Sequence, residues 1–222
     1  MNRRTAAATC LVASAALHAL SYFCWPADSE GTHAEQLAAA GAHSGAWAAA
    51  TWVATAGWLL LVPALVVIWE QVRERGRRLT AIGVWVSALG VAGFVGAGVM
   101  NIVTIGLARY PDHRAALAVF DSLHKDGGLF LFVVAPIMLG TLALVLLMAG
   151  LSRAGWVGWW APAAAFVGVA ASQVLSDSAN PVLLTLAFAP LAATWIAAAR
   201  RLAEPAPAAE RAAARDGSPV IA

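Results

Sequence analysis

Residues 128–151, GLFLFVVAPIMLGTLALVLLMAGL, form an apolar run without a single charged side chain. A helix of this length rises about 36 Å, whereas the hydrocarbon core of a membrane is roughly 30 Å thick. Apolar residues make up 61% of the 222 positions and charged residues only 12%, which is too apolar for a soluble domain of this size. The sequence therefore predicts a membrane protein.

Five further stretches are similar to this run in length and composition. The six predicted spans cover residues 6–25, 46–69, 81–107, 128–151, 156–175 and 181–199. A helix of about 20 apolar residues is sufficient to cross the bilayer. We therefore expect an all-α polytopic membrane protein, with a bundle of six transmembrane helices in residues 1–201 and a disordered tail in residues 202–222.

Lysine and arginine are distributed unequally between the two ends of these spans. If the helices alternate in direction, 11 of the 14 basic residues lie on the side of the termini, and Arg109, Arg114 and Lys125 lie opposite. Because cytoplasmic loops carry the excess of positive charge, both termini are predicted to be cytoplasmic, in a multi-pass protein of the cell membrane. The net charge of +2 then reflects membrane topology and gives no indication of nucleic-acid binding.

Two connections on the predicted outer side are long enough to contain structure. Residues 34–40 favour a short helix in the first connection. In the second, Leu117, Phe120 and Leu123 recur every three residues, as in an amphipathic helix at the membrane surface. Within the third span, small residues at 90, 93 and 96 predict the close approach of another helix.

Polar side chains inside the predicted spans indicate where a site lies, because burying them in lipid is costly. His18, Asn101 and Gln173 all fall in the outer halves of their spans. One interpretation is a polar pocket that opens to the outer side. The alternative is that each side chain bonds a neighbouring helix and only fastens the bundle.

The role of Asp121 has two interpretations as well. His124 and Lys125 follow it by three and four residues, so all three share one helical face. A carboxylic acid kept protonated there would donate a proton to an alkene. An ion pair with Lys125 is the ordinary alternative and would keep the carboxylate ionised.

No metal or cofactor is predicted. His18, His43 and His124 are candidate imidazole ligands for zinc, copper or haem iron, but the chain has none of the short His or Cys spacings typical of such sites. Cys10 and Cys24 are separated by about 21 Å along one helix, too far for a disulfide. The predicted partners are membrane lipids and a hydrophobic small molecule, and the oligomeric state is left open.

Two resemblances add to this reading. The turn at Ser152 and Arg153, followed by WVGWWA at 156–161, resembles a turn in uncharacterised six-helix integral membrane proteins of bacteria. In size, span count and lack of a soluble domain, the chain is similar to the small integral-membrane terpene cyclases. That resemblance implies an isomerase or lyase of secondary metabolism, which protonates and cyclises a prenylated isoprenoid.

The same resemblance assigns roles to residues. The proton-donor candidates are Asp121, Glu70, Asp126 and Asp177. The aromatic residues expected to line the path of the substrate are Trp52, Trp58, Phe94 and Phe120. The polar residues of the predicted outer pocket, which are expected to contact the substrate as well, are His18, Asn101, His124 and Gln173. The competing class is a non-enzymatic membrane protein, such as a transporter subunit, an immunity or resistance protein, or a lipid-binding accessory.

Overall fold

The fold is entirely helical over the part of the chain that the structure describes. This computed structural model describes residues 2–26, 31–73, 75–125, 127–175 and 180–204, and no strand occurs among them. The elements in chain order are α1 (Arg3–Cys24), α2 (His33–Ala42), α3 (Ser44–Gln71), α4 (Arg77–Ala108), α5 (His113–Lys125), α6 (Gly127–Leu129), η1 (Phe130–Val134), α7 (Ala135–Arg153), α8 (Ala161–Val174) and α9 (Pro181–Ala203). The short helices α2 and α5 lie where the two outer connections were predicted to contain helices.

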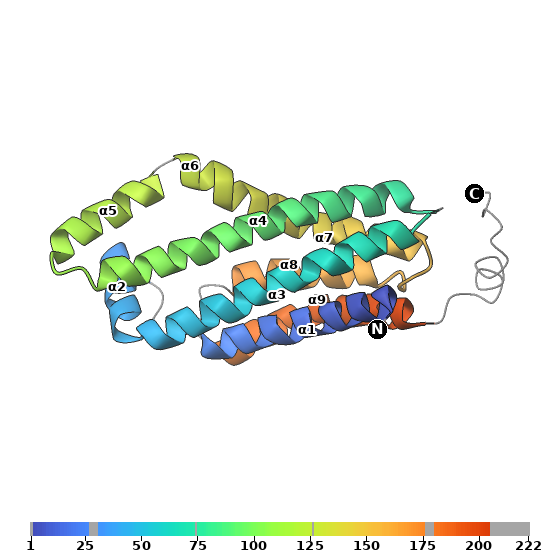
Figure 1. The fold of residues 1–222 in the computed structure, drawn as a ribbon, viewed down its shortest axis with the longest axis horizontal. Coiled ribbons are helices and arrows are strands. Elements are labelled where there is room, and N and C mark those ends of the chain that lie inside the picture. The colour runs from blue at the N-terminus through green and yellow to red at the C-terminus, as the bar shows by residue number, and fades with distance from the viewer. Residues whose placement is uncertain (1, 27–30, 74, 126, 176–179, 205–222) are drawn as a thin grey trace.

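Six helices form a closed ring. Helix α1 packs against α3 and α9, α3 packs against α4, α4 against α7, α7 against α8, and α8 against α9. Figure 1 shows these helices running along the long axis of the molecule, with α2 and α5 at one end and the start of α1 and the end of α9 at the other. Side chains that point into the ring therefore meet in the middle of the bundle.

Five helices are long and apolar enough to cross a membrane: α1, α3, α4, the continuous helix over residues 127–153, and α9. The predicted span 156–175 is wrong at its start, because residues 156–160 form turns and α8 begins only at Ala161. Gly155, at a φ of +73°, ends the preceding helix, and Pro162 suits the first turn of the next one. The 14 residues of α8 rise about 21 Å, less than the roughly 30 Å of a full crossing.

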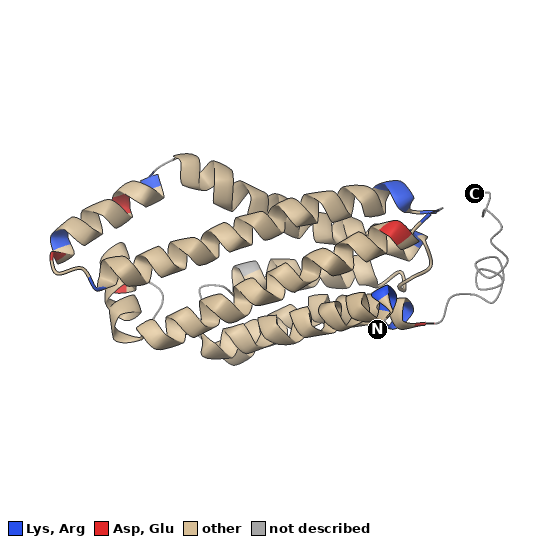
Figure 2. Cartoon of the chain, viewed as in Figure 1, with Lys and Arg blue, Asp and Glu red and all other residues tan. Residues whose placement is uncertain are grey.

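Charged side chains are confined to the two ends of the bundle. Figure 2 shows the Lys, Arg, Asp and Glu residues of the described chain at the α2 and α5 end and at the opposite end, with an uncharged middle between them. An uncharged middle is what a bundle in a bilayer requires, since an ionised group within the hydrocarbon costs several kcal/mol.

Glycines bring α4 and α7 into backbone contact, as the small residues of the third span predicted. A Cβ on Gly90 would lie 2.5 Å from the Cα of Gly140, and one on Gly83 would lie 2.6 Å from the Cα of Leu147. A Cβ on Gly93 would lie 2.9 Å from the carbonyl oxygen of Val133. Larger side chains at these positions would push the two helices apart.

The helix that carries α7 contains a wider turn, η1. There the N–H of Ala135 donates to the carbonyl oxygen of Phe130, five residues earlier. The next residue, Pro136, has no N–H and therefore cannot continue the regular pattern of bonds four residues apart. A π-helical turn at this point accommodates the proline without breaking the helix.

The end of α9 lies later than predicted. The helix continues to Ala203, and Leu202, which was assigned to the tail, is fully buried against the bundle. The predicted disordered tail otherwise lies outside the described residues, which end at 204.

Candidate functional site

All six helices of the ring contribute side chains to one central pocket of about 370 Å³. The lining residues are His18, Ser21, Tyr22, Trp25, Ala54, Trp58, Phe94, Thr141, Leu144, Val169, Ser172, Leu184, Phe188 and Leu191. None of these residues carries a formal charge at neutral pH if His18 is neutral. The pocket is therefore an apolar space with a few hydroxyl groups and one imidazole.

His18 is held in the wall of this pocket by α1 itself. Its Nδ1–H donates to the carbonyl oxygen of Ser14, at 2.7 Å, and the Ser14 hydroxyl donates to the carbonyl oxygen of Gly57 on α3, also at 2.7 Å. Positions 14, 18 and 21 lie on one face of α1 and are all buried. The Nε2 atom of His18 is buried and has no hydrogen-bond partner among the described residues.

Gly57 makes room for the His18 ring. A Cβ at this position would lie 2.8 Å from both the Nδ1 and the Cε1 atoms of His18. No side chain larger than hydrogen fits there unless the imidazole moves. The position of the imidazole thus depends on two helices, α1 and α3.

Aromatic rings from α3 and α9 surround the imidazole, and a ring from α4 extends the group. Trp58 of α3 meets the His18 ring edge to face at 4.3 Å, and it stacks on Phe94 of α4 at 3.7 Å between centroids. Phe188 of α9 stacks on His18 at 5.4 Å, and Trp195, also of α9, lies edge to face at 5.6 Å. These rings offer π faces to a bound molecule or to a developing positive charge.

The serine and threonine hydroxyl groups at the pocket bond to their own helices. Ser21 donates to the carbonyl oxygen of His18 at 2.7 Å, and Ser172 donates to that of Val169 at 2.9 Å. Thr141 donates to the carbonyl oxygens of the preceding turn. The hydroxyl hydrogens of these three residues are therefore used, while lone pairs of their oxygens remain available as acceptors.

Three of the residues predicted to contact a substrate line this pocket: His18, Trp58 and Phe94. Trp52 lies on an outer face of α3 and is 63% exposed, and Asn101 of α4 is partly buried but lies outside the lining. The side chain of Gln173 lies outside the described part of the structure.

Sequence reasoning missed the contribution of α9. Leu184, Phe188 and Leu191 line the pocket, and Trp195 closes it behind His18. The helical spacing of these four residues indicates one buried face of α9. It does not indicate which other helices that face meets.

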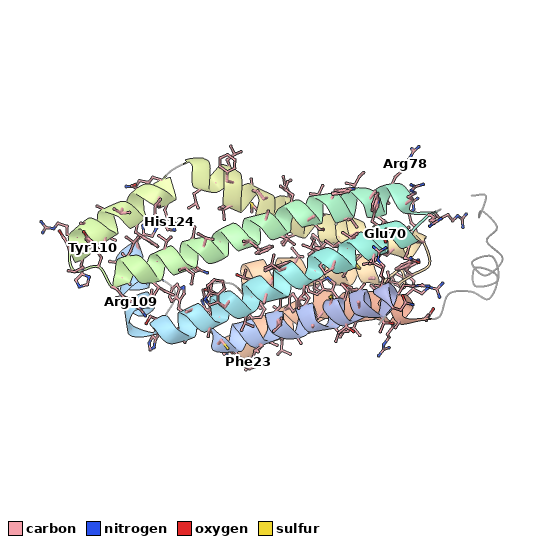
Figure 3. The ribbon with its side chains drawn as sticks, in the orientation of Figure 1. Phe23, Glu70, Arg78, Arg109, Tyr110 and His124 are labelled. Carbon is pink, nitrogen blue, oxygen red and sulfur yellow. The ribbon has the colours of Figure 1, made fainter. Side chains whose placement is uncertain are left out.

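The two proton-donor candidates that the structure describes, Glu70 and Asp121, do not line the pocket. Glu70, near the end of α3, forms an ion pair with Arg3 at 3.1 Å. Figure 3 places Glu70 at the end of the bundle opposite to His124. Asp126 and Asp177 lie outside the described residues.

Asp121 belongs to a separate cluster that joins α2 to α5. Its Oδ1 atom lies 2.5 Å from the Nδ1 atom of His33 on α2. The predicted partner Lys125 forms no ion pair with it, because α2 packs beside α5 and presents His33 to the carboxylate. The rings of His33, Phe120 and His124 contact one another at 4.3–5.1 Å between centroids. We call these four residues the α2–α5 clasp.

The start of α2 positions His33 of the clasp. Thr32 and Glu35 form a capping box, in which each side chain bonds the backbone N–H of the other residue. The hydrogen bond from the Thr32 backbone N–H, with one from its hydroxyl, lowers the pKa of the Glu35 carboxyl. His33 is the first residue of the helix that this box begins.

Neither Phe120 nor His124 lines the central pocket. Within the described ranges, no three His, Cys, Asp or Glu side chains are grouped so that they could hold a metal ion, and Cys10 and Cys24 are free thiols. Comparisons of the chain with protein-family models, with curated proteins and with solved structures found no match.

Proposed function

We propose that this protein binds a neutral, lipophilic small molecule in its central pocket. The observation that carries the proposal is the convergence of six helices on one cavity with aromatic walls. Its volume of about 370 Å³ falls within the range of roughly 300–1,000 Å³ found for ligand pockets. A close-packed bundle whose side chains served only to hold it together would leave no such space.

The chemistry of the lining selects the kind of ligand. An ionised ligand would find no charged partner among the described lining residues, and its desolvation would be costly. A hydroxyl group, in contrast, would find the acceptor oxygens of Ser21, Thr141 and Ser172. Donated to His18 instead, its single hydrogen would satisfy the unpartnered Nε2. The proposed ligand is therefore a neutral alcohol or phenol with an apolar body.

The membrane setting belongs to the same proposal. The helices cross the cell membrane six times, with the shorter α8 completing the ring, and both termini face the cytoplasm. The 11 basic residues on the side of the termini, against three on the other side, support this orientation. A lipophilic ligand would dissolve in the bilayer and enter the bundle laterally between helices.

Catalysis is the finer form of the proposal, namely proton-initiated cyclisation of a prenylated molecule, as the resemblance to terpene cyclases implies. The rings of Trp58, Phe94 and Phe188 support it, because π faces stabilise carbocations. Neither of the described proton-donor candidates reaches the pocket, since Glu70 and Asp121 are each paired with a basic residue away from the lining. Binding without chemistry, as in a lipid-binding accessory protein, therefore has the stronger support.

A pair of substitutions on one helix tests the binding proposal. Ala54 lines the pocket, whereas Ala56, two residues further on α3, is exposed on the outside of the bundle. Ala54→Phe fills the cavity and is expected to weaken binding of a prenyl alcohol by about tenfold or more, since 1.4 kcal/mol corresponds to a factor of ten. Ala56→Phe adds the same ring outside and is expected to change the affinity by less than about twofold.

Binding is measured by quenching of tryptophan fluorescence in the purified, membrane-reconstituted protein. If no neutral lipophilic alcohol binds, or if both variants bind as the wild type does, the pocket is not a ligand site. Mass spectrometry of the same incubations then looks for products of unchanged mass. Such isomers would support the cyclase form, and binding without them would support the accessory form.

A further inference from the structure

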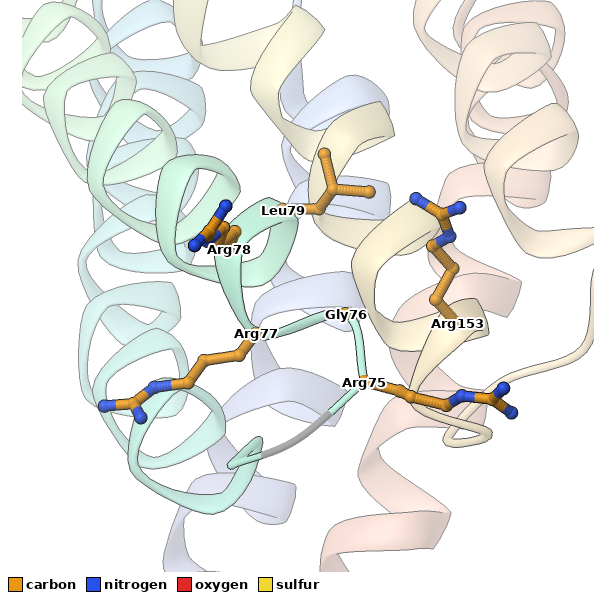
Figure 4. Close-up of a pocket in the computed structure, with 6 residues that line it drawn as sticks. All are labelled: Arg75, Gly76, Arg77, Arg78, Leu79 and Arg153. Carbon is orange, nitrogen blue, oxygen red and sulfur yellow. The ribbon is translucent and has the colours of Figure 1, made fainter.

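A second hollow lies at the end of the bundle where α1 begins and α9 ends. Its volume is about 660 Å³, and its lining comprises Arg75, Gly76, Arg77, Arg78, Leu79 and Arg153. Four of these six residues are arginines. Figure 4 shows Arg78 and Arg153 on either side of Leu79, while Arg75 and Arg77 point away from each other at opposite edges.

Tertiary packing builds this group of arginines, which we call the arginine hollow. Gly76 adopts a φ of +82°, and a Cβ on it would lie 2.2 Å from the carbonyl oxygen of Gly150. This contact holds the turn between α3 and α4 against the last turn of α7. Arg153 consequently joins three arginines that precede it by more than 70 residues in the chain.

The positive charge of the hollow has no acidic partner in the described chain. The described ion pairs of this end join Arg3 to Glu70 and Arg201 to Glu204, and neither includes a hollow arginine. The first turn of α4 also has no side-chain cap. Four exposed guanidinium groups that form no ion pair with a described carboxylate attract an anion, and arginine matches phosphate by paired hydrogen bonds.

Apolar ridges continue from the hollow along both helices. On α4, Ile82, Trp85 and Leu89 lie four, seven and eleven residues after Arg78, on the same helical face, and all are exposed. On α7, Leu146 and Leu142 lie seven and eleven residues before Arg153 and are exposed as well. Both ridges run from the charged end toward the uncharged middle of the bundle.

We propose that the arginine hollow binds the phosphate headgroup of an anionic phospholipid. In this arrangement Arg78 and Arg153 contact phosphate oxygens beside Leu79, and the acyl chains lie along the ridges of α4 and α7. The charge of the hollow and the exposed apolar surface next to it are what such a molecule requires. A free phosphate would use only the arginines and would leave the ridges to bulk lipid.

The test measures lipid retention by native mass spectrometry of the full chain. The protein is released from nanodiscs that contain phosphatidylcholine with either phosphatidylglycerol or cardiolipin. We expect the wild-type protein to retain the anionic lipids preferentially. The variant Arg78→Gln/Arg153→Gln is expected to lose this preference by about tenfold or more, because each arginine near a lipid surface contributes to anion binding.

A matched control removes equal charge from the same end of the bundle. Arg200→Gln/Arg201→Gln changes two arginines in the last turn of α9, outside the hollow. It is expected to leave the preference within about twofold of the wild type. Equal losses in the two variants would overturn the site, since charge alone would then explain retention. Retention of phosphatidylcholine as strongly as the anionic lipids would overturn it as well.

Two further measurements keep the proposal testable if the glutamine variant fails to insert. Arg78→Lys/Arg153→Lys keeps the charge that sets topology but loses the paired geometry of guanidinium, and it is expected to retain less anionic lipid than the wild type. Inorganic phosphate is added to wild-type nanodiscs as a competitor. Displacement of the lipid by low-millimolar phosphate would identify a free anion as the ligand and would overturn the phospholipid proposal.

Discussion

The central pocket and the α2–α5 clasp both place histidine beside aromatic rings, yet the two sites are built differently. His18 in the pocket is 3% exposed and bonds a backbone carbonyl, with no carboxylate beside it. His33 in the clasp bonds the carboxylate of Asp121 and is about a third exposed at its side chain. The first arrangement leaves an acceptor and an empty space, whereas the second uses its polar groups to join two helices. A buried, unsatisfied imidazole beside a cavity therefore indicates ligand binding, and a paired one indicates structure.

The largest effect is expected from closing the space that His18 occupies. Gly57→Val would force the imidazole out of its place and lower the free energy of unfolding by roughly 1–3 kcal/mol, the usual cost of overpacking. It would also abolish ligand binding. Gly45→Val on the same helix is the control, because a Cβ at Gly45 meets nothing within 4 Å. Thermal unfolding and fluorescence quenching measure both effects, and equal behaviour of the two variants would contradict this account of Gly57.

The next effect separates binding from stability. His18→Phe keeps an aromatic ring but removes the Nδ1–H bond to Ser14 and the unpartnered Nε2. We expect less than about 1 kcal/mol change in the free energy of unfolding, because the loss of one hydrogen bond is offset by removal of an unsatisfied atom. Affinity for a prenyl alcohol should fall by about tenfold, or 1.4 kcal/mol. His33→Phe is the comparison, and a loss of affinity there would show that the clasp participates in binding.

A smaller and local effect is expected in the clasp. Asp121→Asn weakens the contact with His33 and should destabilise the docking of α5 by about 0.5–1 kcal/mol, since both side chains are partly exposed. Hydrogen exchange of α5 amides would increase, while that of α1 would stay unchanged. Lys125→Gln serves as the control, because Lys125 forms no ion pair with Asp121. An equal increase in the exchange of α5 amides in the Lys125→Gln variant would show that Lys125 is a partner of Asp121, as predicted from the sequence.

The smallest effect concerns the start of α2. Because hydrogen bonds from Thr32 lower the pKa of Glu35 in the folded protein, its carboxylate stabilises α2 fully above the pKa of the unfolded chain. That contribution is lost as the pH falls through the lower folded pKa. The hydrogen-exchange protection of α2 amides, taken relative to the intrinsic exchange rate at each pH, should therefore decrease on acidification in the wild type. Glu35→Gln should show a weaker dependence on pH, and an identical pH profile would contradict the role of the capping box.

Much of the fold could be predicted because membrane helices are recognised from their apolar composition and their length. The long apolar helices, the short helices α2 and α5 in the two long connections, and the close approach of another helix at Gly90 could all be predicted from local patterns. The span 156–175 failed because its tryptophans are apolar in composition but belong to turns around Gly155 and Gly158. Hydropathy alone cannot distinguish an apolar turn from a helix.

The candidate site was predictable only in part. His18 was selected as a polar residue within a span, whereas Trp58 and Phe94 were selected through the resemblance to terpene cyclases, and all three line the pocket. Phe188 was missed, since an aromatic residue on a buried helical face has no local sign of what it contacts. The pairing of Asp121 with His33 joins residues 88 positions apart, and no local sequence pattern predicts it.

The sequence by itself determined that the chain is a helical membrane protein, where its charged ends lie, and that small residues at 90, 93 and 96 form a stripe on one helix. These properties follow from composition and from the 3.6-residue period of one helix at a time. Only the tertiary structure decided that six helices close into a ring around one pocket, and that Arg153 joins the arginines of the α3–α4 turn. The order and rotation of packed helices depend on side chains that meet across helices, and no local pattern contains that information.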